Sequence, residues 1–125
     1  MTENEIASVI VQSCMNVHRI LGPGLLESTY KDCLHFELVQ KGMLVENEKA
    51  LPLIYKGEKL ESGYRVDLLV EKKVIVELKA VETLNPIYFA QLLTYLKLSN
   101  RKLGLLINFN ECLIKDGIKR VVNNL

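Results

Sequence analysis

Asp67, Glu77 and Lys79 place two carboxylates and an amine where the surrounding residues predict the apolar interior of a β-sheet. Two ionised carboxylates that lie close together repel each other unless a cation lies between them or one of them keeps its proton. Lys79 follows Glu77 by two residues, so its side chain points to the same face of a strand. This combination predicts an acidic pair with an ammonium group on one patch of one face.

The position of Asp67 relative to Glu77 depends on the turn at residues 71–73. If all three residues form the turn, Val70 pairs with Val74 and Asp67 lies directly opposite Glu77, with Cβ atoms about 5 Å apart. A two-residue turn would move Asp67 out of line, and this turn lacks the Gly or Asn usual at a left-handed position. The alternative is an ion pair at the strand edge. The continuous apolar run from residue 74 favours a covered strand, where unpaired charge is costly, and therefore a site.

Composition describes one globular domain, residues 1–125, with 49% hydrophobic and 25% charged residues and a formal net charge of +1. No global basic field indicates nucleic-acid binding, so local charge must hold any anionic partner. No apolar run reaches transmembrane length and the N-terminus is acidic, so we expect a soluble, cytoplasmic protein. Three widely spaced cysteines predict reduced, buried thiols. Dinucleotide, P-loop, α/β-hydrolase and zincin motifs are absent.

The N-terminal third predicts two helices. Residues 2–21 carry apolar side chains at helical spacing, with Thr2 and Glu5 forming a capping box. A Gly-Pro-Gly turn at residues 22–24 ends this helix, and a second helix is expected over residues 25–41.

The remaining chain predicts a mixed sheet. Strands are expected within residues 45–55, with Pro52 at an edge or a bulge, and over residues 60–70 and 74–80. A helix over residues 87–99, with its core face at Phe89, Leu92, Leu93 and Leu96, leads to a strand within residues 101–109. A strand, a helix and a second buried strand favour a parallel pair with a right-handed crossover. The tail is expected to hold a turn at residues 115–117 and an apolar stretch over residues 118–122.

Three further residues could join the acidic pair. Glu27 opens the second helix, where a carboxylate also suits the helix dipole without any site. Packed against the sheet, it would add a third carboxylate and make a hard-cation site suited to Mg²⁺ or Mn²⁺. Gln91 and Tyr95 share a helix face extended by Tyr88, and that face is either a half-exposed polar stripe or a support for the site.

Four ordered blocks of sequence resemble the PD-(D/E)xK nuclease superfamily, and more closely its GxxExxY family. They are Gly24 to Tyr30 (GLLESTY), which matches the family motif in full, then Asp67, then Glu77-Leu78-Lys79, then Gln91 to Leu96 (QLLTYL). Val66 stands where the superfamily name has Pro. The resemblance spans roughly Leu21 to Val122.

The resemblance implies an α/β (α+β mixed sheet) fold with a restriction-endonuclease-like αβββαβ core, preceded here by an additional N-terminal helix. It also implies hydrolysis of phosphodiesters by water that a divalent cation, Mg²⁺ or Mn²⁺, activates. By position, the implied metal ligands are Glu27, Asp67, Glu77 and the Leu78 backbone carbonyl. Lys79 would position water or stabilise transition-state charge, Gln91 would support the site, and Tyr30 and Tyr95 are further supporting candidates.

Two functional hypotheses follow from these residues. The first is a metal-dependent nuclease acting on nucleic acid, with DNA favoured and specificity supplied by a homodimer or a partner. The second is a catalytically inactive binding or assembly module that keeps the nuclease core. For the first we expect the carboxylates of Glu27, Asp67 and Glu77 to converge within reach of one cation and the Lys79 amine to face the same pocket.

Overall fold

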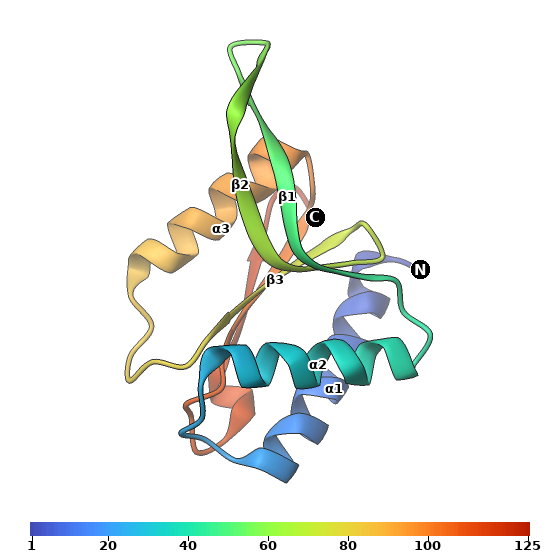
Figure 1. The fold of residues 1–125 in the computed structure, drawn as a ribbon, viewed down its shortest axis with the longest axis vertical. Helices are drawn as coiled ribbons and strands as arrows, with labels where there is room; N and C mark the ends of the chain where they lie inside the picture. The colour runs from blue at the N-terminus through green and yellow to red at the C-terminus, as the bar shows by residue number, and fades with distance from the viewer.

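The computed structural model describes residues 1–125, apart from the side chain of Ser62. Its elements are α1 (Glu3–Leu21), α2 (Glu27–Gln40), β1 (Val45–Tyr55), β2 (Glu58–Val70), β3 (Val74–Lys79), α3 (Pro86–Ser99), β4 (Leu103–Asn108), the 3₁₀ helix η1 (Ile114–Gly117) and β5 (Ile118–Val122). The order α2-β1-β2-β3-α3-β4 confirms the predicted αβββαβ core, and α1 is the predicted additional helix. In Figure 1 the β1–β2 hairpin projects beyond the remaining elements.

The strands form one mixed sheet in the order β1-β2-β3-β4-β5. β3 and β4 pair in parallel through the α3 crossover, as predicted, and the other neighbours are antiparallel. The β1–β2 register shifts between Leu51 and Leu53, which places the predicted irregularity at Pro52. Residues 118–122 form the edge strand β5, which the sequence showed only as an apolar stretch because charged residues interrupt it.

Helices cover both faces of the sheet (Figure 1). α1 and α2 pack on one face, where Leu68, Val76 and Leu78 contribute to a large core. α3 packs on the other face, against Leu69 and Ile75. Because successive strand residues face opposite sides, one apolar run supplies both cores. This two-sided burial explains why residues 74–78 are all buried.

The ends of the helices follow local sequence signals. Thr2 and Glu5 form the predicted capping box of α1, and Gly22 ends that helix with φ of 70°. Asn85 caps α3 by accepting a hydrogen bond from the Ile87 backbone N–H, and Pro86 takes the first helical position. Leu92 and Leu96 are fully buried, while Phe89 and Leu93 are only partly buried.

The expectation of three buried thiols is wrong in part. Cys14 is buried, Cys33 is half-buried and Cys112 is exposed; all three are free. Cys112 lies in the irregular segment that precedes η1. Among the helices that the structure describes, none is both long and apolar enough to span a membrane.

Candidate active site

The acidic pair lies where β2 and β3 separate. These strands pair at Leu68 with Val76, Leu69 with Ile75 and Val70 with Val74, which confirms the register of the three-residue turn. Two turn residues adopt left-handed conformations although neither is Gly or Asn, with φ of 53° at position 71 and 57° at position 72. The backbone pairing ends before Asp67 and Glu77.

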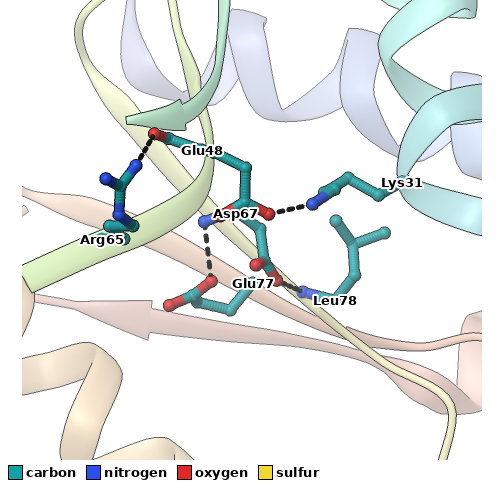
Figure 2. Close-up of polar contacts among 6 residues, drawn as sticks. All are labelled: Lys31, Glu48, Arg65, Asp67, Glu77 and Leu78. Atoms are coloured by element: carbon teal, nitrogen blue, oxygen red, sulfur yellow. Dashed lines mark hydrogen bonds and ion pairs between the residues drawn. The ribbon is translucent and has the colours of Figure 1, made fainter. Parts of the chain in front are cut away.

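Each carboxylate of the pair accepts a hydrogen bond from the backbone of the opposite strand (Figure 2). The Asp67 N–H donates to Glu77 Oε2 at 3.0 Å, and the Leu78 N–H donates to Asp67 Oδ2 at 2.8 Å. Among the residues the structure describes, no hydrogen bond reaches the second oxygen of either carboxylate. One oxygen of each carboxylate is therefore free to bind a ligand. Both residues lie near the C-terminal end of β3, where Leu78 is the last residue but one.

The electrostatics of the pair favour a bound cation. Glu77 is only 9% exposed. Burial, and then the charge of Asp67, raise the pKa of Glu77 to about 8. A divalent cation would offset both effects because it favours the ionised form and supplies the missing positive charge. Two carboxylates and a nearby backbone carbonyl are hard oxygen donors, which fit Mg²⁺ or Mn²⁺.

Glu27 lies across an open cavity from Asp67. The cavity has a volume of about 360 Å³ and is lined by Leu26, Glu27, Ser28, Lys31, Glu48 and Asp67. Burial, and then the charge of Asp67, raise the pKa of Glu27. Glu27 therefore interacts electrostatically with Asp67, and both residues line one cavity.

The expected convergence of three carboxylates on one point is wrong. In the part of the chain that the structure describes, no group of three His, Cys, Asp or Glu side chains is arranged to hold a metal ion. The physical reason is side-chain alternation. Glu77 follows Ile75 by two residues and so belongs to the α3 face, whereas Glu27 comes from α2 on the opposite face.

Lys79 lies on the α3 side rather than in the cavity that Glu27 lines. Its Nζ atom is 4.2 Å from the centroid of the Tyr88 ring, a cation–π contact. Its charge nevertheless acts on Glu77 and on Glu27, where it opposes the rise of the pKa. The ammonium group is thus near the acidic pair but approaches it from α3.

The two predicted supports on α3 differ in their surroundings. Tyr95 is half-buried and its ring stacks on Tyr64, with centroids 4.5 Å apart. Burial, and then the charge of Glu77, raise the pKa of Tyr95. Gln91 is exposed and, among the described residues, forms no hydrogen bond, so the structure gives it no partner in the site.

Tyr30 supports the site indirectly. It is fully buried in the core, and its ring stacks on Phe109 with centroids 4.6 Å apart. Its hydroxyl donates to the Gly22 carbonyl at 2.6 Å and accepts from the Leu25 N–H at 3.0 Å. Tyr30 therefore anchors the loop that presents Glu27, and does not face the acidic cavity.

We expect Tyr30→Phe to destabilise the fold by about 1–2 kcal/mol, because the Gly22 and Leu25 backbone groups lose their shared partner. The measurement is urea unfolding followed by circular dichroism. Tyr55→Phe is the matched control, since Tyr55 is 59% exposed. Equal stability of the two variants would contradict an anchoring role for the Tyr30 hydroxyl.

Two further polar features escaped the sequence reasoning. Glu48 lines the cavity and forms an ion pair with Lys31. Asn108 is completely buried at the end of β4 and binds both the N–H and the carbonyl of Val81, at 3.1 and 2.9 Å. Asn108 thus fixes the backbone two residues after Lys79. The sequence signal for this role was that Asn108 is a single polar residue directly after the apolar run at residues 103–107.

Comparison with solved structures shows the fold. The crystal structure of the protein SSO0001 matches with a TM-score of 0.54 and 21% sequence identity, over 98% of this chain and 60% of that one. An alkaline exonuclease from Laribacter hongkongensis, LHK-Exo, matches with a TM-score of 0.54 and 15% identity, over 99% of this chain and 73% of that one. This chain therefore spans less than two thirds of SSO0001.

No curated protein sequence matches the chain. The family model described as the PD-(D/E)XK nuclease superfamily matches residues 4–121, nearly the whole sequence. Nucleases of this superfamily generally use divalent metal ions, in agreement with the oxygen donors at the strand split. The match and the fold lead to one conclusion: the chain belongs to the PD-(D/E)XK nuclease superfamily.

Proposed function

We propose that this protein is a metal-dependent nuclease and that Asp67 and Glu77 form the centre of its active site. The observation that carries the proposal is the carboxylate pair at the strand split, in which Glu77 is buried and Asp67 is half-buried. Each side chain has one oxygen without a hydrogen bond among the described residues, and no positive charge lies between the two carboxylates. A structural ion pair would not need two carboxylates at this place. Membership of the superfamily supports the same activity.

In this proposal Asp67, Glu77 and the Leu78 carbonyl would hold the metal. The metal would supply a Lewis acid for the phosphate and lower the pKa of bound water. Glu27 would add negative charge from the far wall of the cavity. Lys79, held over Tyr88, would place an ammonium group where charge develops on the phosphate. Tyr95 would close the site on the α3 side, and Gln91 would need a substrate or water as its partner.

We further propose Mg²⁺ or Mn²⁺ as the metal, DNA as the substrate and the GxxExxY family as the branch of the superfamily. The GLLESTY motif at residues 24–30 supports the branch assignment. We treat residues 1–125 as one nuclease-like domain, acting in the cytoplasm. The net charge of +1 supports specificity through a homodimer or a partner over strong general affinity for DNA.

The test is a cleavage assay on single-stranded, duplex and branched DNA and on RNA. We expect chelation with EDTA to abolish cleavage and addition of Mg²⁺ or Mn²⁺ to restore it. Calorimetric titration with Mn²⁺ gives a readout that is independent of activity. Binding of Mn²⁺ without cleavage of any substrate would support the alternative, an inactive nuclease-fold module. Absence of both would refute the proposed site.

A further inference from the structure

Lys31 and Glu48 form an ion pair on the wall of the acidic cavity (Figure 2). Lys31 lies one helical turn after Glu27 on α2, and Glu48 comes from β1. The Lys31 side chain is only 16% exposed, whereas that of Glu48 is 45% exposed. The Lys31 side chain is therefore the less exposed of the two, and Lys31 lines the cavity together with Glu27 and Asp67.

The charge of Asp67 contributes to the pKa of Lys31. Burial lowers the pKa of Lys31, but the hydrogen bond and charge of Glu48, with a further contribution from Asp67, outweigh this effect and leave the pKa raised. Lys31 in turn opposes the rise of the Glu27 pKa. Glu27 and Asp67 line the same cavity as Lys31, so without Glu48 the ammonium group would have these two carboxylates as alternative partners.

The backbone of β1 is irregular at Glu48. Asn47 pairs with Leu68 and Lys49 pairs with Val66, so Glu48 lies across from Asp67, with φ of 51°. A left-handed conformation is unusual for glutamate. The Arg65 Nη1 atom donates to the Glu48 carbonyl at 3.2 Å and supports this conformation.

β2 is also irregular opposite Glu48. Val66 and Leu69 both pack in the α3 core, although residues three apart in a regular strand face opposite sides. The intervening Asp67 lines the cavity on the α2 side. The distortion at Glu48 therefore coincides with the place where β2 turns Asp67 toward Glu27 and Lys31.

We propose that Glu48 is a positioning residue of the metal site: by binding Lys31, it keeps the ammonium group from pairing with Asp67 and leaves that carboxylate free for the cation. This inference rests on the proposed metal site. Lys31, held at the cavity wall by Glu48, is then available to a phosphate beside the cation. Glu48 itself does not contact the metal.

The test is calorimetric titration of the intact protein with Mn²⁺ at pH 7.5. We expect Glu48→Gln to weaken binding by about five- to tenfold, because the released ammonium competes at Asp67. The double variant Lys31→Met with Glu48→Gln should bind within about twofold of the wild type, since the competitor is gone. Glu46→Gln is the matched control: it breaks the Lys49–Glu46 pair on the same strand and should change nothing.

Three outcomes would overturn the inference. Wild-type affinity in Glu48→Gln would mean that Lys31 does not compete. Equally weak binding in Glu48→Gln and in the double variant would make Glu48 a metal ligand or a structural residue. In both cases binding by the wild type leaves the proposed metal site intact. Absence of Mn²⁺ binding by the wild type would instead remove the metal site and this inference together.

Discussion

Replacing Lys79 by methionine is expected to lower the rate of nucleic-acid cleavage by about 10³-fold, the effect typical of removing one preorganised group that stabilises transition-state charge. Lys79 is the last residue of β3 and follows Glu77 by two positions. Its Nζ atom lies 4.2 Å from the centroid of the Tyr88 ring, and this contact holds the ammonium group in place. Methionine keeps much of the side-chain length and removes the charge. The measurement is single-turnover cleavage at saturating Mg²⁺.

Lys102→Met is the control for this change. Lys102 is exposed and directly precedes β4, which runs parallel to β3, so it lies at the opposite end of these strands from Lys79. We expect near wild-type cleavage in the control. Mn²⁺ binding should persist in Lys79→Met, because the acidic pair is intact. Cleavage by Lys79→Met at the wild-type rate would remove Lys79 from the active site.

Stability without metal is expected to fall as the pH rises from about 5 to 8, because Glu77 keeps its proton in the folded protein. The pKa of Glu77 is about 8 in the fold, against an ordinary value of 4.5. Below pH 4.5 both states are protonated, and the full contribution to stability is present. Between these values the unfolded state releases the proton first, which costs up to about 1.4 kcal/mol per pH unit. Above pH 8 the contribution is lost.

The measurement is urea unfolding from pH 5 to 8, with and without Mn²⁺. Glu77→Gln retains an oxygen that can accept from the Asp67 N–H but cannot titrate, so the difference from the wild type isolates Glu77 from other groups. We expect the variant to show a flatter profile. Mn²⁺ should stabilise the wild type more at pH 8 than at pH 5, and should have little effect on the variant. Parallel profiles for the two proteins would contradict a raised pKa.

Local chemistry made much of the fold predictable. The capping box at Thr2, the glycine-rich loop after α1, and the apolar periods located the helices within a few residues of their ends. The length of the charged turn at residues 71–73 determined the register of β2 and β3. These signals act between residues that are close in sequence, so a pattern is enough to read them.

Contacts between distant segments were not predictable in the same way. Nothing in residues 45–55 indicates that Glu48 would take a left-handed conformation and reach Lys31, because this geometry depends on how β1 packs beside α2. Likewise, the hydroxyl of Tyr30 is used by the loop at residues 22–25, although the motif suggested a place in the site.

Turn length alone predicted the register of β2 and β3, and the period of two predicted that Lys79 shares a face with Glu77. The expectation that Asp67 lies on that same face is wrong, because Asp67 lines the cavity on the α2 side. Only the tertiary structure decided how β2 and β3 part there, so that each carboxylate binds the opposite backbone. It also decided that Glu27 approaches Asp67 from the α2 face while Glu77 and Lys79 belong to the α3 face. The physical reason is that helices pack on both faces of the sheet. Side chains that the sequence motifs suggest as one site therefore lie on opposite faces.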